Sequence, residues 1–156
     1  MVNLKLTSSA FSDGGEIPRE YGYKNGNREP QLTISGTPDG TKSLALIMDD
    51  PDAMGAVGKV WVHWVIWNIS PGALKIYRYD KSQTPEIGLS DKGMTDFGEV
   101  GYGGPAPPDK RHTYVFKLYA LDSILDLPEG STKSELEKAM EGHIIEQTQL
   151  TGTYAP

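Results

Sequence analysis

The stretch Val60-Trp-Val-His-Trp-Val-Ile-Trp-Asn-Ile69 decides the fold, because its apolar side chains occupy both alternating phases. β-Branched and aromatic residues favour strands, and an apolar run in both phases is typical of a strand covered on both faces. A second run of this kind, Ser43–Met48, ends at Asp49 and Asp50. Two such strands predict a sheet that lies between other layers, as in a β-sandwich.

Shorter patterns predict further strands. Leu4–Leu6 and Leu32–Ile34 have apolar residues at alternate positions, and Thr148–Tyr154 is expected to return as a short strand. Thr113–Leu121 predicts a longer strand, in which every second side chain points to the same face. The side chains expected on one of its faces are those of His112, Tyr114, Phe116 and Leu118.

One helix is expected after residue 131. Thr132-Lys-Ser-Glu135 has the spacing of a capping box, in which two side chains satisfy the first free backbone N–H groups. Apolar residues follow at helical intervals, namely Leu136, Ala139, Met140, His143 and Ile144. His143 is in line with this apolar face, so we expect it to be a core histidine and not a ligand.

The composition bounds the class of protein. A chain of 156 residues has the usual size of a single domain, residues 1–156, and its 18 Gly and 11 Pro indicate many turns. The net charge of -6 argues against a nucleic-acid binder or a protein drawn to anionic bilayers. The first residues contain no apolar run of secretory or membrane-spanning length, so we expect a cytoplasmic protein without membrane insertion. The absence of Cys excludes disulfides, thiolate catalysis and Cys-based metal sites.

Two polar groups interrupt or follow the buried strands. Asp49-Asp50-Pro51-Asp52 comes directly after the first, where an acidic turn solvated at a sheet edge is the alternative to a functional role. His63 lies in the second and, by alternation, shares a face with Trp61, Val65 and Trp67. A buried imidazole without a partner costs about 1–3 kcal/mol. An Asp at the end of a neighbouring strand is the expected acceptor, although a structural histidine is an equally good interpretation.

A second polar pair, His112 and Tyr114, would point to the same face of the later strand and reach one ligand together. The preceding loop Gly101–Pro108 (GYGGPAPP) combines glycines that permit close backbone approach with prolines that stiffen the curve. No helix can continue through these prolines, which excludes a Rossmann or P-loop site. The region Ser70–Lys110 has no sustained period and is therefore expected to form a pocket.

Several motifs resemble, in the same order along nearly the whole chain, those of the phosphatidylethanolamine-binding protein family, and most of all its bacterial and archaeal branch. They are Phe11–Pro18, Gly40–Leu46, Asp50–Ala53, His63–Val65 with Asn68-Ile69, Gly101–Pro108 with His112–Tyr114, Tyr119–Asp122 and Ala139–His143. The resemblance implies a mainly β fold: an antiparallel β-sandwich, with a large central sheet on a smaller one and a few peripheral helices, one of them C-terminal.

The resemblance also implies a pocket for phosphate-like anions or phosphoethanolamine headgroups. By their positions in the motifs, the ligand-binding set is Asp50, Pro51, Asp52, His63, Gly104, Pro105, His112 and Tyr114. The polar contacts of the family pocket correspond to Asp50, His63, His112 and Tyr114. Its walls correspond to Asp52, Gly104 and Pro105. Imidazole and phenol groups are suitable donors to phosphate oxygens, and a carboxylate beside them favours a ligand that also carries a positive charge.

The chain departs from the family pattern at three positions. Ala106 stands where relatives often have Cys, Thr113 where they often have Arg, and Met54 where Pro is usual. The missing Arg removes a positive charge near the pocket, so lower anion affinity is expected.

Two classes of function are compatible with these motifs. The first is a regulatory binding protein that senses a small anion, and members of the family that inhibit serine-type proteases or kinases make such targets possible partners. The second is a hydrolase acting on a phosphorylated or ester substrate, with Asp50, His63 and His112 as general base or metal ligands. The motifs contain no Ser or Thr with an evident nucleophilic role. We therefore expect no enzyme, no catalytic residue, and no metal or other cofactor.

Overall fold

The computed structural model describes residues 3–73, 75–76 and 90–156, and within them the chain forms two β-sheets. The larger sheet has six strands in the order β2-β9-β8-β4-β5-β7, and the smaller has three in the order β1-β3-β6. The strands are β1 Lys5–Ser8, β2 Gly15–Glu16, β3 Leu32–Ser35, β4 Ser43–Asp50, β5 Trp61–Ile69, β6 Lys75–Ile76, β7 Asp91–Lys92, β8 His112–Leu121 and β9 Ile144–Tyr154. The helices are a 3-10 turn at Arg19–Tyr21, α1 Ala53–Val57 and α2 Lys133–Met140.

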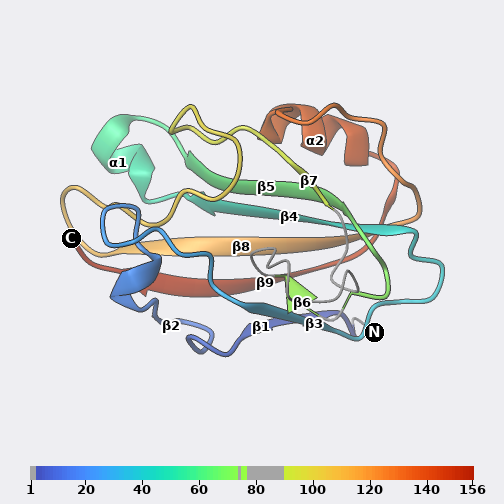
Figure 1. The fold of residues 1–156 in the computed structure, drawn as a ribbon, viewed down its shortest axis with the longest axis horizontal. Coiled ribbons are helices and arrows are strands. Elements are labelled where there is room, and N and C mark those ends of the chain that lie inside the picture. Colours follow the sequence, from blue (N-terminus) through green and yellow to red (C-terminus); the bar gives the residue numbers. More distant parts are fainter. Residues whose placement is uncertain (1–2, 74, 77–89) are drawn as a thin grey trace.

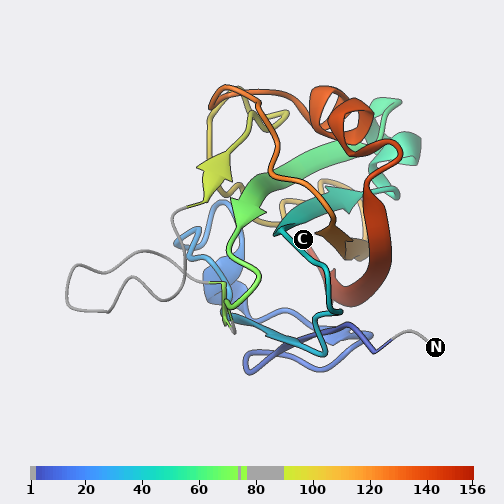
Figure 2. The same cartoon turned by 90° about the vertical axis from the view of Figure 1, so that its right-hand side faces the viewer.

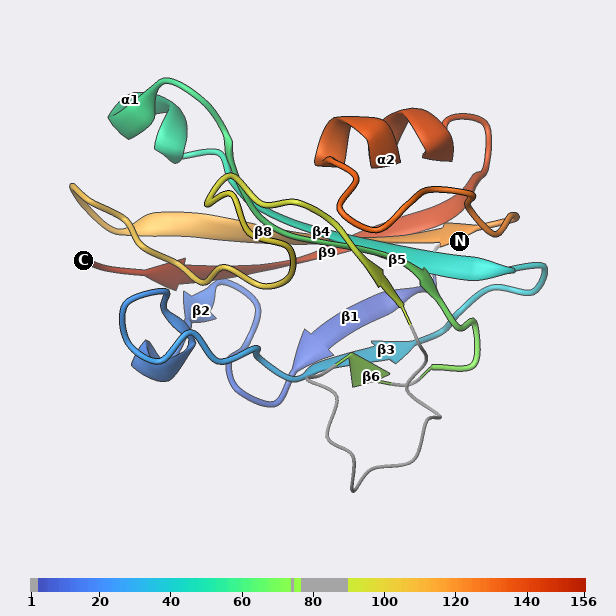
Figure 3. The ribbon, with the colours of Figure 1, turned by 45° about the horizontal axis from the view of Figure 1, so that its top comes forward.

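The smaller sheet covers one face of the larger sheet, and α2 lies on the other (Figures 1 and 3). One apolar cluster fills the space between the sheets, and a second packs under α2. All eight residues of β4 are buried, as its apolar sequence predicts. The mainly β sandwich expected from the sequence is therefore confirmed. No helix in the described ranges is long and apolar enough to cross a bilayer.

The larger sheet is antiparallel except at one edge. β2 pairs in parallel with β9, with Gly15 opposite Gly152, and the other described pairs of this sheet are antiparallel, as the family resemblance implies. β9 is also longer than the predicted strand at 148–154, and it curves from the α2 side towards the smaller sheet (Figure 2). In β8 the predicted alternation is confirmed, since Tyr114 and Phe116 belong to the core between the sheets and Tyr119 to the core under α2.

The helix α2 has the predicted capping box, with Thr132 Oγ1 accepting from the backbone N–H of Glu135. It ends at Met140, however, because Gly142 has φ +79° and turns the chain into β9. The prediction that His143 is a core residue is wrong. Its Nδ1 lies 2.8 Å from Asp122 Oδ1, and its side chain is 45% exposed.

A β-bulge in β5 changes the direction of His63. Trp64 lies opposite Met48 and Val62 opposite Asp49, so His63 is an extra residue without a partner in β4. A bulge of this kind locally breaks the alternation of side chains. Val65 and Trp67 pack under α2, whereas the His63 ring contacts Tyr114 on the other side of the sheet. The predicted common face with Val65 and Trp67 is therefore wrong, and only Trp61 shares the environment of His63.

The two neighbouring acids at the end of β4 serve opposite faces. Asp49 points towards α2, where Lys133 Nζ lies 2.7 Å from its Oδ2. Asp50 points to the inter-sheet side, towards His112. Strand alternation thus gives Asp49 a structural ion pair and leaves Asp50 available to a polar cluster at the sheet end.

The loop Gly101–Pro108 is fixed between β5 and the segment after the 3-10 turn. The backbone N–H of Gly103 donates to His63 O at 2.8 Å, and that of Gly104 donates to Asn27 Oδ1 at 2.7 Å. A Cβ at Gly104 would overlap the carbonyl oxygen of Tyr21. The loop can approach this closely because position 104 carries no side chain.

Gly104→Ala tests this close approach. We expect it to lower the free energy of unfolding by about 1–3 kcal/mol, because the added methyl group meets backbone and not a movable side chain. Urea unfolding followed by circular dichroism measures the change. Gly55→Ala in α1, where a Cβ meets no atom within 4 Å, is the matched control and should be neutral or slightly stabilising. Equal stability of the two variants would contradict the role given to Gly104.

Candidate functional site

A pocket of about 200 Å³ opens where β4, β5 and β8 come together near α1. Asp50, His63 and His112 are its polar lining residues. The remaining lining residues are apolar, namely Ala53, Ala56, Val57, Trp61, Phe97, Ala106 and Pro108. The pocket is therefore a mainly apolar cup with a small polar cluster.

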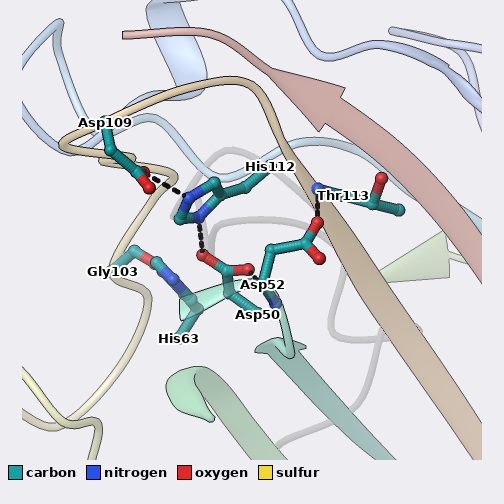
Figure 4. Close-up of polar contacts among 7 residues, drawn as sticks. All are labelled: Asp50, Asp52, His63, Gly103, Asp109, His112 and Thr113. Atoms are coloured by element: carbon teal, nitrogen blue, oxygen red, sulfur yellow. Dashed lines mark hydrogen bonds and ion pairs between the residues drawn. The ribbon is translucent and has the colours of Figure 1, made fainter. Parts of the chain in front are cut away.

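Asp50, the last residue of β4, uses both oxygens of its buried carboxylate. Its Oδ2 lies 2.6 Å from His112 Nδ1, and its Oδ1 accepts from the backbone N–H of Asp52 at 2.9 Å (Figure 4). β4 and β8 are neighbours in the sheet. The Asp50–His112 bond therefore ties the end of one central strand to the start of the next.

A second carboxylate holds the other ring nitrogen of His112. Asp109 Oδ1 lies 2.7 Å from His112 Nε2, and its side chain is 43% exposed, whereas that of His112 is fully buried (Figure 4). Burial alone disfavours a charged His112, but the bonds to Asp50 and Asp109 outweigh it and raise the pKa of His112. With a carboxylate on each nitrogen, both nitrogens act as donors, and the imidazolium form is favoured.

His63 is held differently. Its Nδ1 lies 2.7 Å from the carbonyl oxygen of Gly103, which can only accept, so Nδ1 carries the proton. The sequence predicts an Asp in this position. That prediction is wrong, because the bulge directs the ring to the loop and Asp50 is engaged by His112. Burial lowers the pKa of His63, so the ring is favoured as the neutral form with Nε2 as an acceptor.

Tyr114 lies beside the histidines and is not a lining residue of the pocket. Its ring meets that of His63 edge-on, with centroids 5.1 Å apart. Its buried hydroxyl has no hydrogen bond of good geometry within the described part of the chain. Burial, together with the charge of Asp50, raises the pKa of Tyr114. Tyr114 is therefore favoured as a neutral phenol next to the polar cluster.

The other four predicted residues surround the pocket without lining it. Asp52 Oδ2 accepts from the backbone N–H of Thr113 at 2.8 Å, and Pro51 lies between the two acids of the turn. Gly104 packs on the segment 21–23, and Pro105 O accepts from the backbone N–H of Tyr23. These residues fix the positions of the lining residues, and whether any of them contacts a ligand stays a prediction.

Some residues in or beside the pocket are not predicted from the sequence. Asp109 precedes His112 by three residues in a polar loop, where a carboxylate is common for local reasons. Phe97 lies in the region without a pattern, although its ring stacks on Tyr23 and meets Trp61 and His63 edge-on. Ala106, singled out only as a departure from a family pattern, lines the pocket. The part of the predicted pocket-forming region at residues 74 and 77–89 lies outside the described residues.

The arrangement is suited to binding by charge and hydrogen bonds. The polar cluster combines two carboxylates with an imidazole that is favoured in its charged form, and His63 adds an acceptor. No Ser, Thr, Tyr or Lys side chain is among the lining residues found in the described ranges. Those ranges also hold no group of three His, Asp or Glu side chains placed to bind a metal.

Comparison with known proteins agrees with this architecture. The family model described as phosphatidylethanolamine-binding protein matches residues 7–155. A UPF0098 protein of Methanothermobacter thermautotrophicus is 43% identical over 155 residues, covering 97% of this chain and 98% of its own. A UPF0098 protein of Chlamydia muridarum is 41% identical over 153 residues, with 97% and 98% coverage.

Solved structures show the same fold. A phosphatidylethanolamine-binding protein homologue from Chlamydia trachomatis superimposes with a TM-score of 0.87 at 39% identity, covering 99% of this chain and 98% of that one. The Escherichia coli protein YbcL gives 0.84 at 30% identity, with 97% and 98% coverage. On the match of the family model and of these relatives over nearly the whole chain, this protein belongs to the phosphatidylethanolamine-binding protein family.

Proposed function

We propose that the pocket binds a small organic phosphate, of the kind found in a phosphoethanolamine headgroup. The observation that carries the proposal is His112. It is a buried imidazole favoured in its charged form, and its Nε2 already donates to a carboxylate oxygen of Asp109, the residue after the lining residue Pro108. Charge-assisted N–H···O bonds of this kind are among the stronger hydrogen bonds in proteins. A phosphate oxygen is a chemical match for the oxygen of Asp109.

The rest of the pocket favours an organic phosphate over the inorganic ion. His63 offers an acceptor at Nε2, which suits an ammonium or hydroxyl group on the ligand. The apolar walls, including Trp61 and Phe97, suit methylene groups. The volume of about 200 Å³ lies below the roughly 300–1,000 Å³ of pockets for drug-sized ligands, so a headgroup is a better fit than a larger molecule.

The family supports the same ligand class. The matching family model carries the name phosphatidylethanolamine-binding protein, and the chain retains the histidines and the Asp of the motifs that resemble it. Thr113 has its backbone N–H on Asp52 and lies on the face away from Asp50 and His112. An Arg side chain at this position, which is often present in relatives, would therefore project from the face of β8 opposite Asp50 and His112. Having Thr there instead of Arg leaves the hydrogen-bond donors of the pocket in place.

The alternative is a hydrolase. Asp50 and His112 form the carboxylate–imidazole pair that orients a general base in many enzymes. His112 lacks a free nitrogen here, however, and no nucleophilic side chain is among the lining residues that the structure describes. The geometry therefore supports binding better than turnover. Inhibition of a serine-type protease or kinase rests on the family resemblance, and a cytoplasmic location on the sequence, so both stay predictions.

Calorimetric titration with phosphoethanolamine tests the proposed ligand. We expect binding to the wild-type protein and a loss of roughly ten- to hundred-fold in affinity in His112→Asn, because one charge-assisted bond contributes about 1.5–3 kcal/mol. His143→Gln, which changes a histidine bound to Asp122 away from the pocket, is the control and should bind like the wild type. Absence of binding to the wild-type protein, or equal binding to the two variants with intact folding, would refute the proposal.

The two pocket histidines should titrate in opposite directions. By proton nuclear magnetic resonance in His143→Gln, we expect the His112 ring to titrate above 6.5 and the His63 ring below it. The charged His112 then stabilises the fold below pH 6.5, and this contribution is lost as pH rises through its folded pKa. His63, neutral in the fold, instead lowers stability as pH falls below 6.5. A His112 ring that titrates at or below 6.5 would contradict the charged-donor role.

A further inference from the structure

Asp109 differs from Asp50 in how firmly it is held. Asp50 is almost fully buried, lies within β4, and has its second oxygen on the backbone N–H of Asp52. The Asp109 side chain is 43% exposed and lies in the turn before β8. Both carboxylates lie 2.6–2.7 Å from a nitrogen of the same ring. Asp109 can therefore move away from His112 into solvent, whereas Asp50 would remain as a buried carboxylate without its partner.

We infer that the Asp109 carboxylate occupies the position in which the anionic group of a ligand binds, and that the ligand displaces it from there. Asp109 thereby makes the pocket selective for zwitterionic over simply anionic ligands. The inference rests on the proposed function and adds the residue that selects among phosphate ligands by their charge. An anionic oxygen can reach His112 Nε2 only after Asp109 Oδ1 leaves it, because that nitrogen carries one hydrogen.

The charges of the cluster explain the selectivity. One imidazolium between two carboxylates has a net charge of one negative unit. A simple phosphate ester adds negative charge and takes His112 from Asp109. The phosphate and the Asp109 carboxylate are then left close together as like charges. A ligand with an ammonium group at the other end provides Asp109 with a new cation. Asp109 then exchanges His112 for the ammonium, and the phosphate takes its place on Nε2.

Neighbouring cations do not provide the same compensation. Arg111 NH1 is 3.3 Å from Glu16 Oε1, and both Lys110 and Arg111 are exposed. Exposed ion pairs contribute little because solvent screens them. Lys59 Nζ lies over the ring of Trp61 but pairs with Asp96 Oδ1 at 2.8 Å. No Lys or Arg is among the described lining residues, so a cation on the ligand is the new partner that we expect for Asp109.

The test compares phosphoethanolamine with propyl phosphate, which has the same chain length but ends in a methyl group. We expect the wild-type protein to prefer phosphoethanolamine, and Asp109→Asn to reduce the ratio of the two affinities about tenfold, mainly by tighter binding of propyl phosphate. Asp126→Asn, which removes the same charge from an exposed position after β8, should leave the ratio unchanged. Asp109→Ser is a second variant, because Asn still presents a carbonyl oxygen where the carboxylate was and Ser does not.

A readout without ligand completes the experiment. The pKa of His112, measured by imidazole nuclear magnetic resonance, should fall in Asp109→Asn and stay unchanged in Asp126→Asn. An unchanged affinity ratio in both Asp109 variants would overturn the inference and leave the proposed function intact. Failure of both phosphates to bind any of the proteins would overturn the inference and the proposed function together.

Discussion

The short bond between Asp50 and His112 is the contact on which the site depends. It joins the end of β4 to the start of β8, the two strands at the centre of the larger sheet, in a place where both side chains are excluded from water. A buried carboxylate and a buried imidazole are each costly alone, and together they satisfy one another. The pair therefore closes the sheet end and at the same time favours the charged form of the His112 imidazole beside the pocket.

The sequence predicted the architecture well because its signals are local. The apolar β4 and β5, the alternation in β8 and the capping box at Thr132 each depend on near neighbours along the chain, and all are found in the structure. Strand alternation also placed His112 and Tyr114 on one face. These features follow from periodicity, which a single sequence displays.

The errors have a common physical origin, because they depend on register between distant segments. Nothing in the sequence near His63 shows that β5 has one more residue than β4 at that point, so alternation assigned it to the wrong face and to the wrong partner. Asp109 and Phe97 likewise join the site through loops whose course depends on the whole fold. The helical spacing continues to His143 and Ile144, whereas the helix itself ends at Met140, two residues before Gly142 with its positive φ.

The parallel pairing of β2 with β9 has a consequence for the order of folding. Gly15 pairs with Gly152, and His112 pairs with Tyr154. Both β2 and the start of β8 therefore complete their pairing only when β9, the last strand, has folded. Contacts with such large sequence separation form late, because the entropy of closing long loops opposes them. During synthesis the core between the sheets, which contains Leu150 and Tyr154 of β9, therefore stays open until β9 has left the ribosome, although the lining residues of the pocket all come earlier in the chain.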